Sequence, residues 1–259
     1  YPIAAVGHRQ GSLVSRRAWV EHHMGMPMSV HLRGTDLDRP DVDKAVAAAY
    51  GVLARMDEIF STWSPTSQVS RLRRGDLALH DCDPLVAQAA RIGEQAHELT
   101  RGAFTTALPD DHGTLRFDPT GLVKGWSVEL AGAQLRGLPG VSWCLNAGGD
   151  VLAGRHEHIP PTGADAVPWR IGIEDPHDRS RIARVVPISA GAVATSGTAA
   201  RGAHLYDPVA GHHVGRAGST SVVGPNLLWA DIWATALFVG GATTRAAFAG
   251  HTAYQAVDL

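Results

Sequence analysis

The sequence predicts an α+β fold: one domain of mixed or antiparallel sheets with helices packed on them. Three observations point to this class. Two segments with helical periodicity come early in the chain, short strand-like segments fill the second half, and the two kinds do not alternate regularly. The 259 residues, 44% hydrophobic and 19% charged, have an ordinary globular composition.

The first half of the chain predicts a strand followed by helices. Residues 1–18 are polar and are expected to form a flexible arm, so that the domain spans 19–259. Trp19 to Arg33 alternates roughly and predicts one strand. Asp41 to Phe60 carries apolar residues at intervals of three and four, which predicts a helix with one buried face.

Two further helices are expected before the strands begin. Asp83-Pro84 provides an N-cap and a first-turn proline, and so predicts a helix start. Another helix is predicted from near Lys124 to about Leu135.

The second half predicts short strands separated by Gly, Pro and Asp turns. A helix at 227–239 and a short strand near the C-terminus are expected to follow. The predicted strands are Ser142–Leu145, Val151–Leu152, Trp169–Ile173, Ala183–Ile188 and Ala192–Thr195.

Composition excludes several classes of protein. A net charge of −2 gives no basic face for nucleic acid. The longest apolar run, 227–241, is short and contains Asp231, so no transmembrane segment is predicted.

Cys82 and Cys144 lack the spacing of a zinc site or a disulfide framework. No signal peptide or lipobox is visible, which slightly favours the cytoplasm, although the sequence starts at Tyr1 rather than Met.

The apolar helix predicted at 227–239 contains the first candidate for chemistry. Asp231 and Thr235 lie four residues apart and so share one helical face. A buried carboxylate needs a partner, and a carboxylate beside a hydroxyl suits a hard cation such as Mg²⁺. Alternatively, Asp231 caps a neighbouring loop and Thr235 bonds back to its own helix. The residues alone leave both readings open.

Four glycine-bearing segments could bring backbone amides close to a phosphate, although none has the spacing of a known nucleotide-binding loop. Each one alone is also compatible with an ordinary turn. They are 117–125, 146–150, 195–198 and 201–208.

The order of these and other short motifs resembles the ApbE family of flavin transferases, whose members move FMN from FAD onto a Thr or Ser of another protein. The resemblance covers nearly the whole chain. It runs through Met24–Met28, Phe60–Pro65 with Ser67, Ser70, Arg71 and Leu72, Thr100–Phe104, Asp118–Gly125, Asn146–Asp150, Trp169–Pro176, Ala194–Gly197, His204–Pro208 and Asp231–Thr235.

The resemblance implies roles for individual residues. Asp231, Thr235 and the carbonyl of Gly121 correspond to the family's Mg²⁺ ligands. His204 and Asp231 are candidates for the base that accepts the hydroxyl proton. The FAD-binding positions are Met24, Trp63, Ala103, Phe104, Thr105, Asp118, Lys124 and His204.

The implied activity is Mg²⁺-dependent transfer of FMN from FAD to a Thr or Ser hydroxyl of an acceptor flavoprotein, with release of AMP. Hydrolysis of FAD to FMN and AMP, or FAD binding without turnover, are alternatives from the same site. This chain departs from the family at Thr105, where Asp is frequent, and at Pro119 and Thr120. Pro119 lacks a backbone donor, so flavin contact or acceptor chemistry could differ here.

Overall fold

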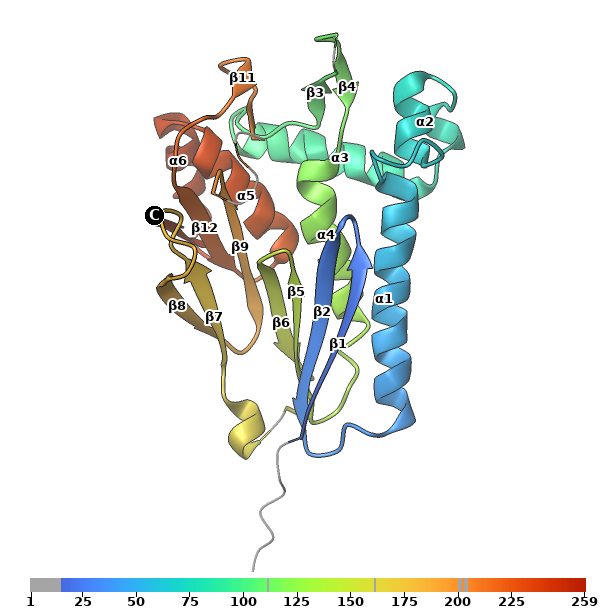
Figure 1. Cartoon of the computed structure of the whole chain (residues 1–259), viewed down its shortest axis with the longest axis vertical. Helices are drawn as coiled ribbons and strands as arrows, with labels where there is room; N and C mark the ends of the chain where they lie inside the picture. Colours follow the sequence, from blue (N-terminus) through green and yellow to red (C-terminus); the bar gives the residue numbers. More distant parts are fainter. Residues whose placement is uncertain (1–14, 111, 161, 200–201, 203–204) are drawn as a thin grey trace, which may run out of the picture.

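The computed structural model describes residues 15–110, 112–160, 162–199, 202 and 205–259. A seven-stranded sheet forms its centre (Figure 1), and every neighbouring pair of strands in it is antiparallel. The α+β prediction is therefore confirmed. In spatial order the strands are β1 (Ser15–His23), β2 (Met26–Gly34), β5 (Ser142–Ala147), β6 (Asp150–Arg155), β9 (Gly191–Gly197), β12 (Ser219–Gly224) and β13 (Gln255–Asp258).

Three helices pack together against one face of this sheet (Figure 1). They are α1 (Pro40–Phe60), α4 (Thr120–Ala133) and α5 (Leu227–Val239). Helix α1 buries one apolar face, whereas α5 is apolar nearly all round and lies inside the protein. The main hydrophobic core lies between these helices and the sheet.

The hairpin of β7 (Trp169–Glu174) and β8 (Ile182–Ile188) forms a second small core with the sheet. This core contains Cys144, Val151, Ala153, Ile173, Ile188 and Val193. At its edge, the guanidinium of Arg33 lies 3.7 Å from the ring centroid of Trp169, and the indole N–H of Trp169 donates to Ser142 Oγ at 2.8 Å.

The remaining elements are short, except for α3. Figure 1 shows the β3–β4 and β10–β11 hairpins projecting at the end of the molecule where α3 crosses above α4. Their bounds are α2 (Gln68–Arg74), η1 (Leu79–Asp81), α3 (Pro84–Leu99), β3 (Ala107–Pro109), β4 (Leu115–Phe117), η2 (Gly163–Ala166), β10 (Tyr206–Asp207), β11 (His212–His213) and α6 (Ala242–Phe248).

The predicted single strand at 19–33 is wrong, because two strands joined by a turn at Met24-Gly25 occupy this segment. Residues 15–18 of the predicted arm belong to β1, and residues 1–14 lie outside the described part of the chain. Helix α4 begins at Thr120, four residues before the predicted start. Among the described residues, no helix is long and apolar enough to span a membrane.

Candidate functional site

A cavity of about 900 Å³ opens where the ends of several elements meet. Its size is in the range of pockets that hold a large organic ligand. Its walls come from the β1–β2 turn, the loop after α1, the first turns of α4, the β5–β6 turn, the loop after β7, β9 and one face of α5. Segments far apart in the sequence therefore build one site.

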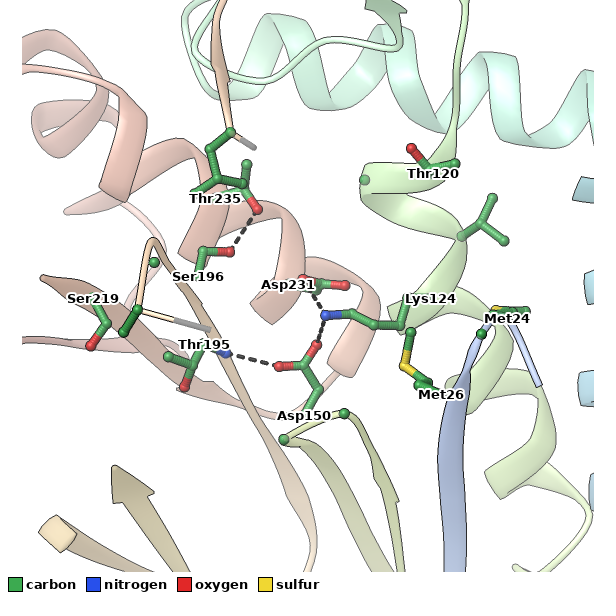
Figure 2. A pocket seen from close by; sticks show the side chains of 18 of the residues that line it. Met24, Met26, Thr120, Lys124, Asp150, Thr195, Ser196, Ser219, Asp231 and Thr235 are labelled. Carbon is green, nitrogen blue, oxygen red and sulfur yellow. Dashed lines mark hydrogen bonds and ion pairs between the residues drawn. The ribbon is translucent and has the colours of Figure 1, made fainter. Parts of the chain in front are cut away.

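An ion-paired cluster lies at the centre of the cavity (Figure 2). The ammonium of Lys124, from α4, pairs with the carboxylate of Asp150 and lies 3.6 Å from Oδ1 of Asp231 on α5. Asp150 is itself held in place, because its Oδ1 accepts the backbone N–H of Thr195 at 2.9 Å. One lysine thus stands between two deeply buried carboxylates.

Asp231 is almost completely buried. The pKa of Asp231 is raised to about 7, mainly because burial disfavours its charged form; the charge of Asp150 also raises this pKa, whereas Lys124 and the backbone amide of Gly125 lower it. Its Oδ2 is buried and has no hydrogen-bond partner in the described part of the structure. A buried carboxylate oxygen in this state is suited to a cationic ligand.

Thr235 lies one helical turn after Asp231 on α5 and also lines the cavity. Its hydroxyl forms a hydrogen bond of 2.8 Å with that of Ser196 on β9 (Figure 2). Gly121, in the first turn of α4, is part of the same lining. A carboxylate, a hydroxyl and a backbone carbonyl are hard oxygen donors of the kind that Mg²⁺ prefers, so the types of residue in this lining fit the ion.

No group of three or more His, Cys, Asp or Glu side chains among the described residues is arranged to hold a metal.

Five of the predicted FAD-binding residues also line the cavity, at the β1–β2 turn and in the loops after α1 and α3. They are Met24, Trp63, Ala103, Phe104 and Thr105. Trp63 is 94% exposed, so its indole presents a nearly free π face. Ala103 and Phe104 are buried, and Phe104 N–H is held by the hydroxyl of Thr100 at 3.0 Å.

Asp118 is placed differently from the other candidates. It is not part of the cavity lining, and its carboxylate pairs with Arg73 at 2.9 Å. It also accepts hydrogen bonds from the backbone N–H and the hydroxyl of Thr120, at the start of α4. Asp118 therefore orders this helix start beside the cavity. His204 lies outside the described residues.

Several residues of the site had no role assigned from the sequence, among them Asp150, Asp57 and Ser219. Asp150 stood in a glycine-bearing segment, but its contact with Lys124 depends on the sheet and α4 meeting. Asp57, on α1, and Ser219, on β12, also line the cavity. Ser219 Oγ is buried and has no hydrogen-bond partner among the described residues, a feature that no sequence pattern signals.

Comparison with curated proteins finds two relatives, both described as FAD:protein FMN transferase. The protein from Vibrio cholerae is 28% identical over 144 residues, which are 52% of this chain and 41% of the relative. The protein from Klebsiella pneumoniae is 28% identical over 171 residues, which are 62% of this chain and 47% of the relative. The matched region spans less than half the length of each relative.

Solved structures show the same fold at lower identity. The ApbE protein of Thermotoga maritima superposes with a TM-score of 0.76 at 19% identity, covering 94% of both chains. Flavin transferase ApbE from Vibrio cholerae gives a TM-score of 0.75 at 19% identity, covering 95% of this chain and 94% of that one. The flavinyl transferase ApbE of Pseudomonas stutzeri gives a TM-score of 0.72 at 22% identity, covering 94% of this chain and 90% of that one.

The sequence model of the ApbE family matches residues 24–110 and 105–257. These ranges include both the aromatic part of the cavity lining and the buried charges at its centre. The chain belongs to the ApbE family, because the family model matches most of the chain and the chain shares its fold with solved ApbE proteins.

Proposed function

We propose that this protein transfers FMN from FAD to a Thr or Ser hydroxyl of an acceptor protein, in a Mg²⁺-dependent reaction that releases AMP. The observation that carries this proposal is the buried cluster of Lys124, Asp150 and Asp231 at the centre of a large cavity. Family membership supports the same chemistry, since the curated relatives are FAD:protein FMN transferases.

Asp231, Thr235 and the Gly121 carbonyl would hold the Mg²⁺. When bound, the ion supplies positive charge that stabilises the pyrophosphate oxygens and the departing phosphate. Asp231 fits this role because its buried Oδ2 has no hydrogen-bond partner among the described residues. Thr235 fits because its hydroxyl lines the cavity on the same face of α5.

Lys124 would contact the pyrophosphate as a point charge. Its ammonium is already placed inside the cavity by Asp150, whose carboxylate is fixed by the Thr195 backbone N–H. A charge that is oriented before the substrate arrives lowers the reorganisation needed during the reaction. Lys124 and Asp150 would therefore act as a pair.

The reaction is an in-line displacement at phosphorus. The acceptor hydroxyl oxygen bonds to the FMN-side phosphorus, the bond from that phosphorus to the bridging oxygen breaks, and AMP leaves with the electron pair. The hydroxyl proton passes to a base, for which His204 and Asp231 are the candidates. Asp231 would be weakened as a base while it holds a cation.

The flavin ring would lie at Met24 and Trp63. Trp63 has an exposed indole face on the loop after α1, and such a face stacks well on a flat aromatic ligand. The apolar lining at Phe104 and the backbone at Ala103 would bound the same end.

The direct test mixes the protein with FAD, Mg²⁺ and an acceptor peptide containing a Thr. Chromatography follows AMP, and mass spectrometry follows the peptide. A gain of the mass of FMN on the peptide, abolished by EDTA, is the expected result. AMP and FMN with an unmodified peptide would indicate hydrolysis of FAD instead, and bound FAD without AMP would indicate a flavin-binding protein.

A further inference from the structure

The turn between β1 and β2 breaks a local sequence preference. His23 pairs with Met26, so Met24 and Gly25 form a two-residue turn, with φ of 53° and 73°. Such turns need a left-handed backbone at both central residues and favour Asn, Asp or Gly at the first. Among the described residues other than glycine, only Met24 and Arg101 have a positive φ. Methionine in this position is strained.

A carboxylate from another element holds this turn. The backbone N–H of Met24 donates to Oδ2 of Asp57 at 2.8 Å. Asp57 lies in the last turn of α1, and its side chain lines the cavity together with Met24 and Gly25. The Asp57–Met24 bond thus joins two walls of the cavity that are 33 residues apart in the sequence.

The backbone of Asp57 also defines the loop that carries Trp63. The Asp57 carbonyl accepts the N–H of Ser61 at 2.9 Å, which is the bond at the end of α1. Residues 61–63 follow directly and line the cavity. One residue therefore contacts the Met24 turn through its side chain and the start of the Trp63 loop through its backbone.

We propose that Asp57 is a positioning residue. Its carboxylate keeps Met24 in the left-handed conformation and sets the Met24 side chain relative to the loop that carries Trp63. The identity of the ligand bound at this end, the flavin ring of FAD, rests on the proposed function. The hydrogen bond and its effect on the turn do not.

Other contacts already hold the hairpin on α1. The hydroxyl of Tyr50 donates to the carbonyl of Met28 at 3.2 Å, and the ring of His23 stacks on that of Tyr50 with centroids 5.9 Å apart. Loss of the Asp57 carboxylate should therefore free the turn without releasing the strands. This difference separates positioning of the turn from a general structural role.

The first experiment follows the turn without any ligand. The chain has four methionines, so selective ¹⁵N-methionine labelling gives few amide signals, and a Met24→Leu variant assigns that of Met24. Asp57→Leu removes the acceptor at similar size, Asp57→Asn keeps a carbonyl oxygen, and Glu58→Gln is a matched change at the exposed neighbour. Amide exchange is then measured at all four methionines.

In Asp57→Leu we expect amide exchange at Met24 to accelerate about tenfold, because this variant loses one charge-assisted hydrogen bond. Met26, Met28 and Met56 should exchange as in the wild type, and Asp57→Asn and Glu58→Gln should change exchange at Met24 by less than about threefold. Unchanged exchange at Met24 in Asp57→Leu would overturn the proposal. Equal acceleration at all four methionines would overturn it as well, since it would mean general loosening.

The second experiment tests the consequence for ligand binding. Asp57→Leu should weaken FAD about tenfold and reduce the quenching of flavin fluorescence, while the affinity for AMP stays unchanged. Equal loss of FAD and AMP, or no loss of FAD, would contradict positioning of the flavin end. A wild-type protein that binds no FAD would defeat the proposed function, and the exchange experiment would still decide the role of Asp57 in the turn.

Discussion

At Asp231, burial raises the pKa and the nearby ammonium of Lys124 lowers it; burial has the larger effect, and the pKa is raised to about 7. In the folded chain this residue contributes little to stability by itself, since a buried charge must recover its lost hydration from partners. The proposed function gives a reason for this placement, since the proposed reaction needs a cation at this position. The cost of burial is thus a sign of function at the scale of a single residue.

Asp231→Asn tests this view directly. Asparagine keeps the size of the side chain but cannot bring a negative charge to a cation, so AMP release should fall by about two orders of magnitude or more. The melting temperature without Mg²⁺ should stay the same or rise, because a buried charge has been removed. Calorimetry and the AMP assay measure both effects, and full activity in this variant would disprove the metal assignment.

Ser219 offers a second test on one side chain. Its hydroxyl is buried, lines the cavity and has no hydrogen-bond partner among the described residues. Ser219→Ala should therefore raise the free energy of unfolding of the ligand-free protein by up to about 1 kcal/mol. Chemical denaturation measures this change. Ser221→Ala is the contrasting variant, because the Ser221 hydroxyl forms a hydrogen bond of 2.7 Å with that of Thr195. Loss of this bond should lower the free energy of unfolding.

At the scale of whole elements, the N-cap of α3, Asp83, makes the free energy of unfolding depend on pH. The Leu85 N–H donates to Oδ1 of Asp83 at 2.9 Å. This bond lowers the pKa of Asp83 below its usual range, although burial opposes it, and Arg55 lowers the pKa further. The carboxylate therefore stabilises the fold fully above the unfolded pKa, and this stabilisation is lost as pH falls through the lower, folded pKa.

Asp83→Ala should lower the free energy of unfolding by about 0.5–2 kcal/mol at pH 7. The difference from the wild type should shrink as the pH falls below about 4, because both proteins then lack the charged cap. Urea denaturation at a series of pH values measures it. A difference that stays constant down to pH 2.5 would contradict the assigned cap.

The contact between α4 and α5 depends on a glycine. A Cβ on Gly125 would lie 3.0 Å from Cβ and Oδ2 of Asp231 and 3.1 Å from the carbonyl of Leu227. Gly125→Ala should thus move Asp231, destabilise the fold by about 1–3 kcal/mol and reduce AMP release. Gly137→Ala is the control, because a Cβ there would meet nothing within 4 Å. It should leave both the stability of the fold and AMP release unchanged.

Elements with strong local signals could be predicted from the sequence, and those with weak ones could not. The bounds of α5 are confirmed, since an apolar run between Asn226 and Gly240 has clear ends. The β1–β2 turn was missed because Met-Gly is not a usual hairpin turn. Helix α2 has only seven residues, and β12 begins with the polar sequence Ser219–Ser221, so neither shows a clear period.

Over the whole molecule, most of the site residues could be named only through the family resemblance, because their contacts join segments far apart in the chain. Local pattern placed Asp231 and Thr235 on one face of a helix, and the structure places both in the cavity lining. No local pattern indicates that Asp150 meets Lys124, or that Asp57 meets Met24. Such pairs depend on tertiary packing, which short-range periodicity does not encode.

Mg²⁺ should stabilise the whole protein, because the proposed ligands come together only in the folded state. At a concentration of about 100 times its dissociation constant, the ion should add roughly 2.7 kcal/mol, or a rise in melting temperature of about 5–10 °C. Differential scanning calorimetry with Mg²⁺ or EDTA measures the shift. The shift should be absent in Asp231→Asn, and an equal shift there would place the ion elsewhere.

The seven strands of the central sheet follow one another across it in the same order as in the chain. Much of the cavity lining therefore comes from long connections between strands that are already neighbours, among them 35–141 between β2 and β5, 156–190 between β6 and β9, and 225–254 between β12 and β13. Neighbouring strands can keep their register whatever the connection between them contains. Such a protein can diverge one insertion at a time, so that a new specificity arises by exchange of a single connection on an unchanged sheet.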